Sequence, residues 1–314
     1  MIEKFNFYDI YGYFLPGAVV LLLFWLPIGI KQHKLPSGDW TSALLGAVLA
    51  YIVGVLLQTF VGKLLPPIVG IAGTGDDKHP RYPSERLLDP FQPQSAWPPQ
   101  LSDCVREQVA GAIDQKLGID RAKLVLEGIP DRKADFMRNE AFFLARHFLI
   151  LKKGTGYTEQ FEGMYALTSA LAAALALATA YYFGWALNFF ESDWIPFTAV
   201  LTVTFGLLIA VNATALLFLT KKFLILQWTT AAGLVMAAFG TGYGLGYHYE
   251  ISHGFAAALT LAAIAALLAS LRSYGFYREF IEYFAITVWR GFLMASKQKD
   301  SPGGAEESNQ KNKA

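Results

Sequence analysis

Arginine and lysine side chains recur at helical spacing along residues 132–153, and they are the groups in this chain best suited to hold an anion. Arg132, Asn139, Arg146 and Lys153 repeat every seven residues, and Arg138 falls on the same side of a helix. Guanidinium groups match phosphate oxygens in geometry, so this face predicts a cytoplasmic site for a nucleotide, an oligonucleotide or a phospholipid headgroup. The simpler interpretation is an ordinary solvated face. The opposite, packing side would then carry Met137, Ala141, Leu144, Phe148 and Leu151.

Neutral polar side chains interrupt the long apolar stretches of the sequence. An amide buried in hydrocarbon is costly unless it finds a partner, so these groups must face protein or water. One interpretation is the lining of a pore or cavity. The other is hydrogen bonding that joins neighbouring helices. The residues are Gln58, Thr198, Thr202, Asn212, Gln227 and Thr230.

Catalytic and metal chemistry find little support in the sequence. His248 and His253 flank Glu250, but their spacing does not bring both imidazoles to one helix face. His79 and His147 lie without a serine, cysteine or carboxylate pair at a spacing that suggests a nucleophile. We therefore predict no enzyme activity, no cofactor and no metal site.

The composition indicates that the polar residues named above are carried by long apolar helices. The 314 residues are 54% hydrophobic and only 16% charged, with a mean hydropathy of +0.34. Six long stretches carry no Asp, Glu, Lys or Arg, and a run of roughly 18 apolar residues is enough to cross a bilayer. The prediction is an all-α integral membrane protein with six transmembrane helices, which excludes a secreted enzyme, a nucleic-acid-binding domain or a disulfide scaffold. The stretches are 10–30, 40–62, 164–190, 194–220, 223–247 and 254–271.

Lysine and arginine near the ends of the predicted spans set the expected orientation. Nine lie on one side and two on the other, so both termini are expected in the cytoplasm. The predicted parts are an N-terminal transmembrane pair (1–62), a cytoplasmic insertion (63–163), a four-helix transmembrane bundle (164–271), an interfacial or cytoplasmic helix (272–296) and a disordered tail (297–314). The sequence leaves open whether residues 272–296 lie along the inner interface or dock on the insertion.

The insertion is expected to begin with a Pro-rich strap and to continue as helices. Six prolines in residues 80–99 oppose a regular helix there. A helix is predicted to follow Ser102 and to stop at Gly118, and a second one to follow Pro130 and Asp131 and to run to about Lys153.

Glycine and alanine at two places predict close helix contacts. Ala172, Ala176, Ala180 and Gly184 recur every four residues, which admits a neighbouring backbone from the same chain or another. Residues 240–244 read GTGYG, which is similar to a potassium-channel filter. No re-entrant helix fits before this run, so we interpret these glycines as close packing or a kinked helix end.

Two short motifs stand out in the N-terminal third of the chain. Residues 8–17 read YDIYGYFLPG, and residues 50–54 read AYIVG and are followed by Gln58. The motifs resemble a loose group of bacterial inner-membrane proteins, some of which look like membrane effectors of anti-phage systems. The arrangement is similar to the channel-forming effector of the Hailong system. That resemblance implies a tetramer gated by DNA oligomers from a partner nucleotidyltransferase, and it transfers no ligand residues to this chain.

Two functions of different classes are consistent with the sequence. The first is a multi-pass protein of the bacterial inner membrane, an oligomeric channel-like effector gated by its cytoplasmic domain, with a role in phage defence. The second is a non-conducting scaffold or assembly subunit whose strap and helices recruit a cytoplasmic partner protein. A lipid-modifying enzyme would need a polar catalytic cluster at one interface, which the sequence does not offer.

Overall fold

The computed structural model describes residues 9–33, 40–71, 83–88, 101–124, 132–152, 156–187, 202–203, 206, 209, 223–249 and 252–297. These residues form helices and short turns, and no strand occurs among them. The chain divides into two compact units. We call Met1–Pro80 with Glu162–Phe280 the span unit, and Arg81–Phe161 with Ile281–Ala314 the insertion unit.

Four helices in the described part of the chain are long and apolar enough to cross a membrane. They are Asp9–Gln32, Trp40–Gln58, Thr158–Leu187 and His253–Lys297. Of the expected fourth span, 194–220, only residues 202, 203, 206 and 209 are described. The expected fifth span coincides with a helix, α9 (Phe223–His248). The membrane character of the chain therefore stands, while six spans and a cytoplasmic insertion stay predictions.

The N-terminal helices of the span unit meet backbone to backbone. A π-helical turn, η2 (Asp9–Phe14), leads into α1 (Leu15–Gln32), and α2 is Trp40–Ile71. A Cβ atom on Gly17 would overlap the carbonyl of Ala50, and one on Gly54 would overlap the carbonyl of Tyr13. The two N-terminal motifs thus contain the glycines that let these helices touch, which is how small residues act between membrane helices.

An aromatic cluster fills the contact between α1 and α7 (Gly156–Leu187). Tyr181, Tyr182 and Trp185 are buried there. The Tyr181 hydroxyl donates to the carbonyl of Phe24 at 2.9 Å, and its ring stacks on the Phe24 ring. This hydrogen bond gives the buried phenol of Tyr181 a partner in an apolar setting.

The insertion unit is built around the amphipathic helix α6 (Arg132–Leu151). The other elements are α3 (Pro83–Arg86), α4 (Asp103–Leu117), α5 (Arg121–Leu124), the first turns of α7 and the last turns of α10 (His253–Lys297). The predicted helices are confirmed closely, and α4 stops at Gly118, whose φ of 67° suits a residue without a Cβ. The core includes Leu88, Val109, Ile113, Leu124, Ala141, Ala145, Leu149, Val288, Trp289 and Phe292.

The Pro-rich strap differs locally from a wholly extended segment. Its described residues, 83–88, begin as one helical turn, because a proline is tolerated at the first position of a helix. Ser84 donates to Asn139 of α6 at 3.3 Å, and Arg86 forms an ion pair with Glu282 of α10. Leu87 and Leu88 are buried, so this part of the strap is packed on the unit's helices.

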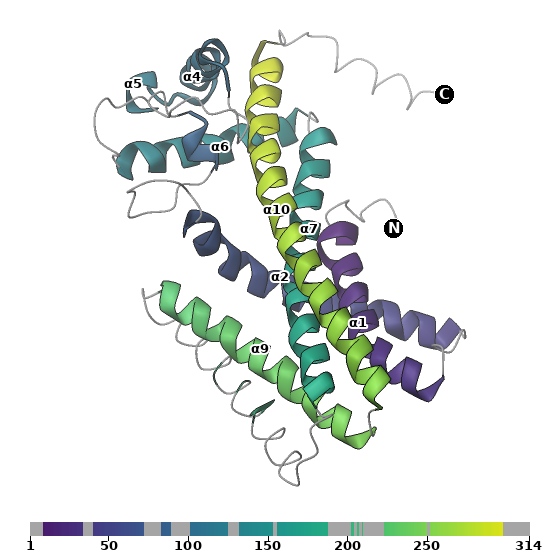
Figure 1. Ribbon diagram of the computed structural model, residues 1–314. Coiled ribbons are helices and arrows are strands. Elements are labelled where there is room, and N and C mark those ends of the chain that lie inside the picture. The colour runs from purple at the N-terminus through teal and green to yellow at the C-terminus, as the bar shows by residue number, and fades with distance from the viewer. Residues whose placement is uncertain are drawn as a thin grey trace, which may run out of the picture. The chain divides into compact units, whose positions relative to one another are not determined.

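The longest helix, α10, runs without interruption through the position where the sequence suggested two segments. Its 45 residues contain no proline and form one unbroken helix (Figure 1). The division between the two units falls within this helix, at Phe280–Ile281. Beyond that point Trp289 packs edge-to-face on Phe142 with ring centroids 5.4 Å apart. Of the two placements left open for residues 272–296, the part from Ile281 therefore docks on α6.

Candidate functional site

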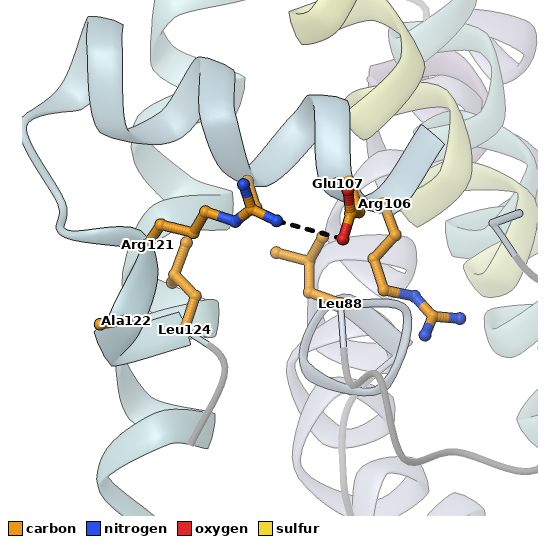
Figure 2. A pocket seen from close by; sticks show the side chains of 7 residues that line it. Leu88, Arg106, Glu107, Arg121, Ala122 and Leu124 are labelled. Atoms are coloured by element: carbon orange, nitrogen blue, oxygen red, sulfur yellow. Dashed lines mark ion pairs between the residues drawn. The ribbon is translucent and has the colours of Figure 1, made fainter. Parts of the chain in front are cut away.

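A pocket of about 320 Å³ lies between the end of α3, helix α4 and α5 in the insertion unit (Figure 2). Its polar feature is an ion pair between Nη2 of Arg121 and Oε1 of Glu107 at 3.1 Å. Both side chains are half-exposed or more, so either one can turn toward a ligand. The pocket is lined by Leu88, Arg106, Glu107, Ala110, Arg121, Ala122 and Leu124.

Arg106 contributes to the pocket through its hydrocarbon stem rather than its charge. The side chain is buried, and its guanidinium points away from the Arg121–Glu107 pair (Figure 2). Its Nη1 lies 3.4 Å from the carboxylate of Asp103, and its Nη2 donates to the carbonyl of Leu101 at 3.4 Å. The pocket thus offers an apolar wall beside one partly neutralised guanidinium, which suits a small ligand with an apolar part and one negative charge.

Sequence reasoning did not find this pocket, and no pattern could have shown it. Arg121 lies in a four-residue helix and Glu107 in another helix, so their approach depends on how α5 folds back beside α4. Among the described residues, no group of three or more His, Cys, Asp or Glu side chains is placed to hold a metal ion.

The predicted anion-binding face of α6 is divided by the fold. Arg138 is buried, with Nε donating to the carbonyl of Leu124 at 2.8 Å and Nη1 paired with Asp135 at 3.0 Å. Through the Leu124 carbonyl, Arg138 ties α6 to α5. Arg146 is half-buried, and its guanidinium lies over the ring of Phe284, 5.9 Å from the centroid.

The remaining two candidates of that face are not seen in detail. Arg132 begins α6, but its side chain is outside the described residues, and so is Lys153.

The buried side of α6 also differs from the expected one. Ala134, Arg138, Phe142 and Leu149 are buried, as are Ala141 and Ala145. Leu144 and Leu151, which the helical pattern placed on the packing side, are exposed. The prediction was wrong here because it set arginine on the water side, whereas Arg138 is buried through the partners described above.

The expected lining residues of the membrane part lie in three different helical segments. Gln58 is half-buried in α2, Thr202 is half-buried in a described part of the fourth stretch, and Thr230 is buried in α9. The backbone of Gln227 is part of α9, but its side chain is not described. Thr198 and Asn212 lie outside the described residues. The lining of a pore or cavity by these groups stays a prediction.

Small residues of α7 meet neighbours within the same chain. A Cβ on Gly184 would overlap the carbonyl of Phe239 in α9, and one on Gly242 would overlap the carbonyl of Tyr181. Nearer the N-terminus of α7, the Ser270 hydroxyl of α10 donates to the carbonyl of Ala172 at 2.7 Å. Residues 240–244 are helical and Gly242 is in close contact with α7, so the interpretation of this run as close packing is confirmed at Gly242.

Comparisons of the chain with protein-family models, with curated proteins and with solved structures find no match.

Proposed function

We propose that this chain is an oligomeric, channel-like membrane effector whose insertion unit controls a polar route through the membrane helices. The observation that carries the proposal is helix α10, which begins as an apolar stretch and ends among the aromatic side chains of α6. Its hydrogen-bonded backbone is unbroken, so a shift of the turns around Trp289 is passed along the helix axis. Displacement of packed helices is a common way of switching a protein.

Helix α7 provides a second continuous connection between the same two parts of the chain. It crosses the boundary of the units at Phe161–Glu162. On the insertion side, Phe161 stacks on Tyr283 of α10 with ring centroids 6.0 Å apart. On the span side, Tyr165 contacts Tyr277, and Ser270 holds Ala172. In this proposal α7 and α10 move together as a pair.

The route itself would use neutral polar groups. Charged residues are absent from the expected span interiors, so Thr202, Thr230 and Gln58, with Thr198, Asn212 and Gln227, are the proposed lining. The proposed stimulus is an anionic cytoplasmic ligand, a nucleotide or oligonucleotide, held by Arg132, Arg146 and Lys153. The Arg121 pocket would take only a small, singly charged part of such a ligand. Placement in the bacterial inner membrane and a role in phage defence follow from the resemblance of the N-terminal motifs.

Membrane potential, followed with a dye in bacteria that express the protein, tests the proposal. A Cβ on Gly275 of α10 meets nothing within 4 Å, so Gly275→Ala fits there and keeps the helix. Gly275→Pro removes a helical hydrogen bond and kinks α10 between its two halves. We expect depolarisation by wild type and Gly275→Ala, an altered response in Gly275→Pro, and suppression by Asn212→Leu.

The rival scaffold function makes the opposite prediction. The channel proposal fails if two results are found together. The membrane potential is unchanged in every strain although the protein reaches the membrane, and purified protein in liposomes passes no ions with or without nucleotide or DNA oligomers. Retention of a soluble partner by the same inactive protein would then support the scaffold.

A further inference from the structure

Helix α6 presents a row of large apolar side chains to the outside of the insertion unit. Its other side is occupied by contacts with α3, α5 and α10. The relative exposure is 68% for Phe136, 58% for Phe143 and 70% for Leu151. Leu144 and Ile150 are exposed as well. A row of this kind on one face marks a contact surface rather than scattered surface residues.

The hydrocarbon of the bilayer is an unsuitable occupant for this row. Helix α6 packs on α10 at Phe284, Trp289 and Phe292. The charge-free stretch of α10 ends at Leu271, and Arg272, Arg278 and Glu279 follow. The contacts with α6 therefore belong to the charged and aromatic part of α10 and not to its charge-free stretch.

The exposed face of α6 is instead complementary to itself. The residues are arranged symmetrically about a point between Phe143 and Leu144, which are neighbours in the sequence. At equal distances on either side of that point, Phe136 matches Leu151 and Glu140 matches His147. Each pair joins apolar to apolar or acid to base. Glu140 and His147 are both exposed.

We propose that a second copy of this chain docks on α6, with the two α6 helices antiparallel about a two-fold axis that passes beside Phe143 and Leu144. In this arrangement Glu140 of each copy faces His147 of the other, and an imidazole N–H can donate to a carboxylate. Phe143 of one copy packs beside Leu144 of the other. The same patch serves both copies, which is the defining property of a two-fold interface.

The proposed pairing is compatible with two copies in one membrane. Copies inserted in the same direction are related by axes parallel to the membrane normal, and a two-fold axis makes two helices antiparallel when they lie perpendicular to it. The proposal therefore sets α6 perpendicular to the membrane normal in both copies. Within the insertion unit, α6 lies across the terminal turns of α10 (Figure 1). The inference rests on the oligomeric part of the proposed function, does not require conduction, and specifies an even number of copies.

The size of the surface determines how it must be tested. One face of a 20-residue helix is smaller than the roughly 1,200–2,000 Å² that stable interfaces bury in total. Confinement of the copies in a membrane raises their effective concentration and makes a small contact sufficient. The experiment therefore uses the full chain in membranes.

Cysteine cross-linking tests the pairing directly. In a Cys104→Ser background, one copy carries Glu140→Cys and a differently tagged copy carries His147→Cys, and both are expressed together and oxidised in isolated membranes. We expect a disulfide-linked heterodimer. Each variant expressed alone should give no dimer, because equivalent positions would lie seven residues, about 10 Å, apart along the antiparallel helices, beyond disulfide reach.

Two further arms make the outcome decisive. Wild type, with its exposed Cys104 on α4, measures random collision and should give no disulfide-linked dimer under the same oxidation. Phe143→Glu added to both copies should abolish the heterodimer without unfolding the protomer, because Phe143 is exposed in it. Absence of the heterodimer, or homodimers of either single variant in equal amount, would overturn the proposal. Neither outcome depends on whether the protein conducts.

Discussion

The hydroxyl of Tyr182 in α7 donates a hydrogen bond of 2.8 Å to the carbonyl oxygen of Leu23 in α1. That carbonyl is the one that Pro27, inside α1, leaves without a helical donor, because proline has no N–H. In an apolar environment a backbone carbonyl without a partner is costly, so the tyrosine completes the backbone of a neighbouring helix. The neighbouring Tyr181 also donates to α1, at the carbonyl of Phe24. The helical donor to that carbonyl is the N–H of Ile28, four residues later, and Ile28 retains its N–H.

Tyr182→Phe should therefore destabilise the span unit more than Tyr181→Phe. Each change removes one hydroxyl and little volume, but only Tyr182→Phe leaves a carbonyl without a donor. We expect a loss of about 1–2 kcal/mol for Tyr182→Phe and less than about 1 kcal/mol for Tyr181→Phe. Thermal unfolding of the purified protein in detergent, followed by circular dichroism, measures the difference. Equal losses would show that the Leu23 carbonyl has another hydrogen-bond donor.

The helices of the insertion were largely predictable from local chemistry. Ser102 before an apolar pattern and Gly118 after it marked both ends of α4, and the charge-free stretches marked the long helices. The continuity of α10 was not predictable in the same way. The charges from Arg272 onward resemble the end of a span, but nothing in that segment breaks a helix, and its aromatic residues find partners on α6.

The candidate site was less accessible to sequence reasoning. Charge at helical spacing identified Arg138 and Arg146 as similar, yet one is buried against the end of α5 and the other lies over an aromatic ring. The Arg121–Glu107 pair joins residues of two helices whose approach is set by the turn after Gly118. Periodicity describes one helix at a time, so contacts between helices need the fold.

Gly54 should tolerate no side chain, because any Cβ there overlaps the carbonyl of Tyr13 in η2. Gly54→Ala should separate η2 from α2 and cost about 1–3 kcal/mol, the usual penalty for overpacking. Gly46 of the same helix has nothing within 4 Å, so Gly46→Ala is the matched control and should be neutral or slightly stabilising. Detergent thermal stability and the yield of folded protein compare the two. A loss in both variants would indicate a general effect on α2.

Trp289 should be a main support of the insertion unit. It is fully buried, packs on Phe142, and belongs to the turns of α10 that join α6. Trp289→Ala should cost about 3–5 kcal/mol through lost burial and a cavity. Met294→Ala, at a position of α10 that is 68% exposed, should change stability by less than about 0.5 kcal/mol. Limited proteolysis of the full chain, read at sites in 101–152, should show faster cleavage only in Trp289→Ala.

Arg138 decides between a structural and a ligand-binding role for the charged residues of α6. Its guanidinium holds the last carbonyl of α5 and the carboxylate of Asp135, and its side chain is 3% exposed. Arg138→Met leaves that carboxylate without this partner and should cost about 3–5 kcal/mol. Arg121→Met, which removes a half-exposed ion pair at the pocket, should cost less than about 1 kcal/mol. Denaturant unfolding of the full chain in detergent compares the two.

A compensating change separates the ion pair from simple loss of packing. Arg138→Met combined with Asp135→Leu removes both charges, so the double variant should regain part of the stability that Arg138→Met loses. A structural arginine predicts this recovery, together with unchanged binding of nucleotide or DNA oligomer once the protein is folded. The opposite outcome is an Arg138→Met variant that is as stable as Arg121→Met but has lost ligand binding. In that case the contacts with Leu124 and Asp135 would not be the main role of Arg138, and Arg138 would again count as an anion-binding residue of α6.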